Sequence, residues 1–391
     1  MEIQKYKNTR KARLFEIFGC AFLVLSGVGL LNRAHLKEFM FSFLTSSFFW
    51  LSIALGSLFF VFLHHLVSAK WSVVVRRFAE QTMKVIPWLG LIIVPVFLYG
   101  AKDLFPWADA HKAAHDHLIH KKQAYLNLPF FNVRAVIYFL VWTGLATVVA
   151  KLSIKHDETG QNKLMEKMKG LSAGGTLLFA LTATFAAFDW IMSLDPHWYS
   201  TIFGVYVFAG CLVAVMAFLS IITLYLHGQG YMKNMITEEH YQDLGKLLFA
   251  FTCFWAYIAF SQYVLIWYGN IPEETVWYAH RWVGSWKWMS LFLVLGHFIV
   301  PFIFLLPRPM KRNRKVLMAF SFWMLFMHLV DLIWLIYPNI YHHGYHFHWY
   351  DVTLMLGFGL LFVGRVLSNL SKASIYPIND PLLQESIHSM S

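Results

Sequence analysis

Ionisable side chains stand inside otherwise apolar stretches of this 391-residue sequence. The stretch 315–338, KVLMAFSFWMLFMHLVDLIWLIYP, contains His328 and Asp331. Their i, i+3 spacing puts both side chains on one face of a helix. A histidine beside a carboxylate can pass protons, because the imidazole titrates near neutral pH. The pair therefore indicates proton transfer, although a paired or protonated aspartate can also simply tie helices together.

Side chains of the same kinds stand in neighbouring apolar stretches. Asp189 and Asp103 each end such a stretch at a depth similar to that of Asp331, and His297 lies deeper, four residues before Pro301. Tyrosine hydroxyls and trapped water can bridge the gaps, so we predict a relay that begins at Asp189. The residues of the predicted proton relay are Asp189, Asp331, His328, His297, Tyr263, Tyr257, Lys246 and Asp103. No residue is predicted to be catalytic.

Other polar residues favour a structural interpretation. The segment SLDPHWYS contains Asp195 and His197 and is typical of a turn between two helices, because aspartate before proline favours turns. Ser200 is predicted to cap the helix that follows this turn. His64 and His65 end another apolar stretch, and we expect them to be shallow enough to reach lipid headgroups or water.

The amino-acid composition is typical of an integral membrane protein. Hydrophobic residues make up 58% of the chain, charged residues only 14%, and the mean hydropathy is +0.53. A span needs about 20 apolar residues, and lipid leaves open backbone without partners, so the apolar runs must be helices. An all-α membrane protein with about ten transmembrane helices is therefore predicted. The ten runs are approximately 14–31, 39–66, 87–104, 130–152, 171–190, 200–226, 244–268, 283–306, 316–337 and 352–367.

The basic residues predict the topology. Most of the 32 Lys and Arg residues fall on one side of the ten runs, and the positive-inside rule makes that side cytoplasmic. Both termini are then cytoplasmic, with tails at 1–13 and 368–391 and one membrane domain that spans about 14–367. The mixed segment 71–87 is expected to lie along the cytoplasmic interface. Because the Lys and Arg residues form short clusters and no extended face, a nucleic-acid partner is excluded.

The opposite side is rich in His, Trp and Tyr. Aromatic residues at helix ends form the usual interfacial belt, but the histidines exceed what a belt requires. His111, His115, His117 and His120 lack a second tract with ligand-like spacing, so a solvated or partner-docking surface is favoured over a metal site.

Several cofactor motifs are missing from the sequence. The three cysteines stand in separate apolar runs, with no CxxCH haem-attachment motif and no iron–sulfur spacing. Only His297 and His328 are deep enough to bind a haem between helices, and their depths are unequal. There is also no Walker A motif, so nucleotide-driven transport is unsupported. We predict no metal and no redox cofactor in this chain.

Two segments carry a family resemblance. TFAAFDWIMSLDPHWYSTIFGVYVFAG (184–210) and SQYVLIWYGNIPEET (261–275), together with the ten-span plan and the His-rich face, resemble the NrfD/PsrC-like membrane subunits of bacterial alternative complex III, a quinol:cytochrome c oxidoreductase. The similarity is to the second, ActF-type, subunit. It covers essentially the whole chain and implies two four-helix bundles, helices 2–5 and 6–9, with helices 1 and 10 at the periphery.

The resemblance also implies a place in a respiratory electron-transport complex of the bacterial inner membrane. Expected partners are a homologous NrfD/PsrC-like membrane subunit, periplasmic iron–sulfur and multihaem cytochrome c subunits, and in some assemblies a terminal oxidase. Iron–sulfur clusters and haem c would belong to those partners, and quinone or menaquinone would be the membrane substrate of the complex. The resemblance makes the homologous subunit the better candidate for the quinol site, so no quinone site is assigned to residues of this chain. The chain itself would anchor the periplasmic subunits and provide a proton path coupled to quinol oxidation.

Two other functions stay open. A secondary transporter would need a midplane site between broken helices, and Pro95 and Pro301 could break helices. The charged residues nevertheless gather near one membrane face. A purely structural membrane anchor for periplasmic partners is the third possibility.

Overall fold

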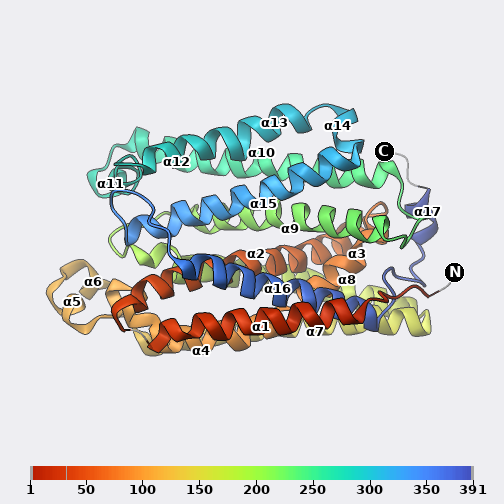
Figure 1. Ribbon diagram of the computed structural model, residues 1–391, viewed down its shortest axis with the longest axis horizontal. Coiled ribbons are helices and arrows are strands. Elements are labelled where there is room, and N and C mark those ends of the chain that lie inside the picture. The colour runs from red at the N-terminus through yellow and green to blue at the C-terminus, as the bar shows by residue number, and fades with distance from the viewer. Residues whose placement is uncertain (1–2, 32, 389–391) are drawn as a thin grey trace.

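The structure, a computed structural model, describes residues 3–31 and 33–388 as helices and connecting loops (Figure 1). Residues 1–2 of the predicted N-terminal tail and 389–391 of the C-terminal tail lie outside these ranges. Ten helical spans in the described ranges are long and apolar enough to cross a membrane, which confirms the predicted all-α membrane fold. The spans are formed by α1 (Thr9–Leu31), α2 (Leu36–Val67), α3 (Val73–Met83) with α4 (Ile86–Leu104), α7 (Leu128–Thr159), α8 (Asn162–Trp190), α9 (Phe203–Gly228), α10 (Glu238–Gly269), α12 (Trp286–Phe292) with α13 (Val300–Leu305), α15 (Arg314–Ile336) and α16 (Trp349–Lys372).

The loops divide between two ends of the helix bundle. The described chain begins and ends at one end, which also contains α14 (Arg308–Arg312) and α17 (Leu383–Ile387) (Figure 1). We call this the basic end. The opposite, His-rich end includes residues 33–35, 105–127, 191–202, 270–285 and 340–348. It contains the short helices α5 (Ala110–His115), α6 (His117–Lys122) and α11 (Pro272–His280).

The spans form two groups of four. In the first bundle α2, α4, α7 and α8 pack together, and in the second α9, α10, the α12–α13 span and α15 pack together. The peripheral helices α1 and α16 pack against each other, and α16 also packs on α2. The bundles meet where α9 contacts α2 and α8, and where α15 contacts α2. A Cβ at Gly56 of α2 would lie 2.5 Å from the carbonyl oxygen of Cys211, so a side chain here would force the two helices apart.

One expectation about this fold is wrong. The segment 71–87 does not lie along a lipid interface, because every residue of α3 is buried in the protein. It packs against α2, α7, α9, α16 and α17. Of the charges that suggested an interface, Lys84 follows α3 and donates to Gln81 Oε1 at 3.1 Å. Arg76 and Arg77 form ion pairs with Glu80 of the same helix and with carboxylates outside it. Because these charges are paired, the polar face of α3 does not need water.

The eighth span contains an irregular segment. Residues Leu293–Ile299, between α12 and α13, form a π-helix that includes His297. Pro301 follows and has no N–H to donate to the carbonyl of His297, which favours such a local widening. Pro95, in contrast, lies inside α4 without interrupting that helix.

Candidate functional site

Asp331 is the centre of a buried polar cluster in the second bundle. The hydroxyl of Tyr206 on α9 donates to Asp331 Oδ1 at 2.5 Å, and the indole Nε1 of Trp255 on α10 donates to Oδ2 at 3.1 Å. All three side chains are buried. Each carboxylate oxygen therefore has a donor from a different helix, which satisfies a polar group that would otherwise be costly in a membrane interior.

Two buried histidines flank this carboxylate. The ring of His297 stacks on Trp255 with centroids 3.8 Å apart, and neither ring nitrogen has a hydrogen-bond partner among the described residues. His328 lies one helical turn before Asp331, as predicted, and its Nε2 is 2.9 Å from Ser52 Oγ of α2. The cluster thus reaches from the π-helix of the second bundle to the first bundle.

Close helix packing holds His328 in this place. A Cβ built on Gly210 of α9 would lie 3.0 Å from His328 Cε1. The ring of Phe49 on α2 also packs against the His328 ring, with centroids 5.6 Å apart. The imidazole is therefore confined between α9 and α2.

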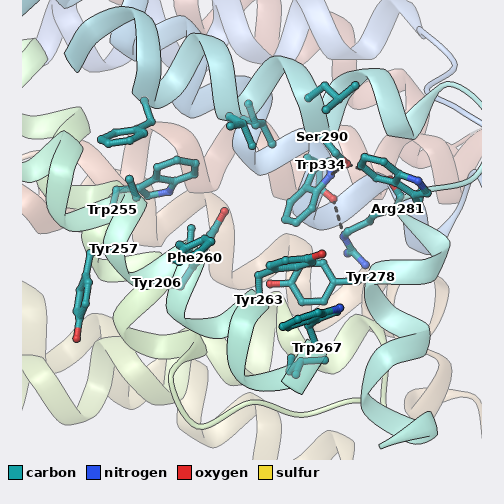
Figure 2. A pocket seen from close by; sticks show the side chains of 18 of the residues that line it. Tyr206, Trp255, Tyr257, Phe260, Tyr263, Trp267, Tyr278, Arg281, Ser290 and Trp334 are labelled. Carbon is teal, nitrogen blue, oxygen red and sulfur yellow. Dashed lines mark hydrogen bonds between the residues drawn. The ribbon is translucent and has the colours of Figure 1, made fainter. Parts of the chain in front are cut away.

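A large aromatic pocket opens beside the cluster (Figure 2). Its volume is about 980 Å³, and it lies between α10 on one side and α11, α12 and the π-helix on the other. Tyr206 and Trp255, the two donors to Asp331, are part of its wall. The two side chains that donate to the buried carboxylate thus also face the pocket.

The pocket is polar at its far end, where Tyr278 and Arg281 lie (Figure 2). Arg281 is 2% exposed and donates to the carbonyl oxygens of Trp334, Trp277 and Leu335 at 2.9–3.1 Å. No carboxylate of the described residues is within ion-pair distance of it. Burial lowers the pKa of Arg281 to about 9, so the guanidinium is still charged at neutral pH.

Tyr278, on the loop helix α11, is the second polar group there. Its hydroxyl accepts a hydrogen bond from Gln262 Nε2 at 3.2 Å, and burial raises its pKa to about 12. The far end of the pocket thus offers a neutral hydroxyl beside a cation.

Not every residue of the predicted relay lies in this cluster. Tyr263 and Tyr257 are in the pocket wall, 44% and 67% exposed, and the hydroxyl of Tyr257 points away from the other labelled side chains (Figure 2). Lys246 is exposed near the basic end and pairs with Asp243 at 3.2 Å. Asp103 is exposed at the last turn of α4. The structure brings together only Asp331, His328 and His297.

Asp189 belongs to a different cluster, in the first bundle. Its carboxylate forms a two-point ion pair with Arg134 of α7, at 2.8 and 2.9 Å, and accepts from the Tyr138 hydroxyl at 2.7 Å. Tyr125 lies over the guanidinium, 3.9 Å from ring centroid to Cζ. Among the described hydrogen bonds of the Asp189 side chain, none reaches Asp331 or His328.

The neighbouring turn is partly as predicted. Asp195 Oδ1 accepts from the backbone N–H of His197 at 3.2 Å, as expected of a turn. The prediction that Ser200 caps the next helix is wrong. The N-cap of α9 is Ile202, and the Ser200 hydroxyl donates to Gln262 of α10 instead.

A second buried charge cluster lies near the basic end. Arg76 pairs with Glu80 at 3.0 Å and with Asp380 at 2.6 Å, while Arg77 pairs with Glu80 at 2.7 Å and with Asp157. These side chains are buried or nearly so. The i, i+3 and i, i+4 spacings of the charges on α3 are the sequence signal that could have revealed the cluster.

His64 and His65 border this cluster at the end of α2, and the expectation that they reach lipid headgroups or water is wrong. They are only 4% and 5% exposed. The ring nitrogens of His64 lie 2.7 Å from Ser72 Oγ and 2.8 Å from Arg76 Nη1. They are buried because α3 folds back beneath the end of α2 and α17 covers α3.

No protein-family model matches the chain, and no match is found among curated proteins. Among the described residues, no group of three or more His, Cys, Asp or Glu side chains is arranged to hold a metal ion. The chemistry of the clusters themselves is therefore what bears on function.

Proposed function

We propose that this chain is a membrane subunit of a bacterial respiratory quinol:acceptor oxidoreductase of the alternative complex III type, in which the second bundle handles protons. The proposal rests on one observation: Tyr206 and Trp255 line the aromatic pocket and also donate hydrogen bonds to Asp331. The resemblance of 184–210 and 261–275 to NrfD/PsrC-like subunits supports the same assignment.

The pocket is suited to a flat aromatic amphiphile such as quinol or menaquinol. Its long wall is apolar and aromatic, and Arg281 and Tyr278 supply polar groups at one end. Oxidation of a quinol to a quinone releases two electrons and two protons. In this proposal the electrons go to iron–sulfur and haem c groups of partner subunits, and the protons go to acceptors of this chain.

Asp331 is the proposed first acceptor. A quinol hydroxyl in the pocket gives its proton to the Tyr206 oxygen while Tyr206 passes its own proton to Asp331 Oδ1, so each oxygen exchanges one O–H bond. His297 and His328 offer unpartnered ring nitrogens nearby for onward transfer. The chain contributes no electron carrier to this scheme.

The proposed topology places the basic end, with both termini, in the cytoplasm and the His-rich end in the periplasm. The short helices α5, α6 and α11 then face the periplasmic redox subunits, together with exposed histidines of that end. The chain would anchor these subunits and pack beside a homologous membrane subunit. Labelling of a cysteine variant of the exposed Ala114, Ala114→Cys, from outside intact cells tests the orientation; labelling only after permeabilisation contradicts it.

The test of the proton role is Asp331→Asn in the intact complex. The amide keeps the shape: its oxygen can accept from Trp255 Nε1, and its NH2 can donate to the Tyr206 hydroxyl oxygen. It cannot take a proton. Because a positioned proton acceptor contributes roughly 100-fold to a rate, quinol oxidation should fall by about that factor while the haem c partners still co-purify. Glu166→Gln, an exposed carboxylate of α8, is the control. Unchanged oxidation and unchanged proton release per electron in Asp331→Asn contradict the proposal.

A secondary transporter is the alternative that one observation favours. Transporters place substrates beside irregular helices, and the π-helix Leu293–Ile299 makes the eighth span irregular. Co-purification in mild detergent separates the two functions. A stable assembly with c-type haem absorbance supports the oxidoreductase, whereas a chain that purifies alone and transports solute in proteoliposomes supports the transporter.

A further inference from the structure

The basic segment before α15 contains two kinds of cation. Arg312 forms an ion pair with Glu239, and the Lys311 ammonium donates to two backbone carbonyls. Arg314 and Lys315, in contrast, are exposed, and no carboxylate of the described residues lies within ion-pair distance of either. Within the part of the chain that the structure describes, no ion pair neutralises these two positive charges.

Both cations border a pocket at the basic end of the second bundle. The pocket has a volume of about 450 Å³ and lies where α9 ends and α10 and α15 begin. The Arg314 guanidinium lies 5.2 Å from the ring centroid of buried Tyr241, whose hydroxyl is hydrogen-bonded to His227 Nδ1. Three helices thus contribute to one cationic recess. The lining residues are Leu224, His227, Gly228, Tyr241, Arg314, Lys315, Met318 and Ala319.

The positive charge comes from side chains and not from the start of α15. The Asn313 side chain accepts from the backbone N–H groups of Lys315 and Val316, at 3.0 and 3.3 Å. The amide groups that could attract an anion at this helix start are therefore already used.

The rest of the pocket is apolar and continues along the membrane-facing side of α15. Leu224, Met318 and Ala319 form its apolar wall. Further along the same helix, Phe322 and Phe326 are 57% and 48% exposed. Their helical spacing extends this wall into a stripe that runs from the cationic recess toward the middle of the span.

We propose that this pocket binds an anionic phospholipid of the surrounding bilayer. The phosphodiester contacts Arg314 and Lys315, and an acyl chain follows Met318, Phe322 and Phe326. A guanidinium and an ammonium match phosphate oxygens, and unpaired basic groups at headgroup depth attract anionic lipid. This inference does not rest on the proposed redox function, since it concerns the opposite end of the second bundle.

Native mass spectrometry of the full chain, in its assembly where it has one, can measure the affinity for phosphatidylglycerol and phosphatidylcholine. We expect tighter binding of phosphatidylglycerol at one site. The double variant Arg314→Gln/Lys315→Gln should weaken that binding about 30-fold and leave phosphatidylcholine unaffected. Arg312→Gln, which removes an internally paired cation from the same segment, should change it less than about twofold. Equal binding of the two lipids, or no loss in the double variant, contradicts the proposal.

A second variant tests the pocket without changing its charge. Gly228 lines the recess, and a Cβ there meets nothing within 4 Å, so Gly228→Leu adds an apolar side chain at the recess without a clash at its Cβ. We expect it to exclude phosphatidylglycerol as strongly as the double variant does. Unchanged binding in Gly228→Leu means that the charges act only on bulk lipid, and competition by millimolar inorganic phosphate means a site for soluble anions. Either result overturns the assignment.

Discussion

Arg134 and Asp189 form a two-point ion pair inside the first bundle, with Nε to Oδ2 at 2.8 Å and Nη2 to Oδ1 at 2.9 Å. Asp189 is 0% exposed and Arg134 7%. Parallel donor and acceptor pairs of this kind fix the relative position of two helices, here α7 and α8. The geometry favours a structural role for Asp189 over a role as the first group of a proton relay.

Removal of one partner should therefore be costly. Arg134→Met leaves a buried, unpaired carboxylate and should lower the free energy of unfolding by about 3–5 kcal/mol, because breaking a buried pair strands a charge. Arg134→Met/Asp189→Asn removes both charges and should recover most of that loss. Unfolding in a denaturing detergent, with a reporter on the first bundle, measures both variants. A double variant that is as unstable as the single one contradicts the pairing account.

The hydrogen bond from Tyr206 to Asp331 gives the second prediction. Tyr206→Phe removes the 2.5 Å bond and leaves a buried carboxylate oxygen without that donor. A bond to a charged group is worth about 1.5–3 kcal/mol, so the free energy of unfolding should fall by that amount. Tyr263→Phe, whose hydroxyl is partly exposed in the same pocket, should change it by less than about 0.5 kcal/mol. Equal effects of the two variants would falsify a specific role for the Tyr206 hydroxyl.

The ten spans could be predicted because each apolar run is long enough to cross a bilayer and lipid leaves no alternative to helices. The i, i+3 relation of His328 and Asp331 was also readable, since helical periodicity depends only on local spacing. The spans and this spacing could be predicted because each depends only on residues within one continuous stretch of the sequence.

Partners between runs could not be predicted in the same way. Periodicity says which residues share a face but not which helix lies opposite, so Tyr206 and Trp255 could not be assigned to Asp331. Arg134 carried a usable signal, because an arginine inside a span needs a carboxylate partner. The sequence did not show which carboxylate. Asp380 and Arg76 are separated by 304 positions, and nothing local connects them.

The C-terminal segment supplies the third prediction. Asp380→Asn removes the 2.6 Å ion pair with Arg76, whose side chain is fully buried. Arg76 keeps its ion pair with Glu80 but loses one of its two carboxylate partners. We therefore expect the free energy of unfolding to fall by about 3 kcal/mol. Glu385→Gln is the control, since its pair with Lys70 is about half exposed and worth less than about 1 kcal/mol. Similar losses from both substitutions would mean that the tail contributes only by surface charge.

Asp116 gives a pH prediction at the His-rich end. Its carboxylate caps α6 by accepting from the backbone N–H groups of Leu118 and Ile119, and it lies 2.6 Å from His197 Nε2. The hydrogen bond from Ile119, aided by His197, lowers the pKa of Asp116 below its usual range. A lowered pKa means that the folded form binds the proton less tightly than the unfolded form. The stabilisation that the Asp116 carboxylate gives to the start of α6 is therefore complete above the ordinary aspartate pKa. It is lost as the pH falls below about 4.

Hydrogen exchange of the Leu118 and Ile119 amides measures this effect. After correction for intrinsic exchange rates, the protection of these two amides should decrease as the pH falls from about 5 to about 3, a range around the ordinary aspartate pKa. Asp116→Asn keeps an oxygen that can cap the helix but cannot titrate. Its protection should stay constant over the same range, and a pH dependence equal to that of the unchanged chain would assign the effect to another group.

The close approach of Gly210 to His328 gives the last prediction. In Gly210→Ala the new Cβ lies 3.0 Å from Cε1 and 3.2 Å from Nδ1 of His328, so the imidazole must move and its 2.9 Å contact with Ser52 must lengthen. Overpacking of this kind costs about 1–3 kcal/mol, whereas alanine gains up to about 1 kcal/mol over glycine from helix propensity alone. Gly144→Ala on α7, where a Cβ meets nothing within 4 Å, isolates that gain. We therefore expect Gly144→Ala to be neutral or stabilising and Gly210→Ala to be less stable than it by about 1–3 kcal/mol. Equal unfolding free energies for the two variants would show that His328 has room to shift, and that its position between α9 and α2 is not sterically determined.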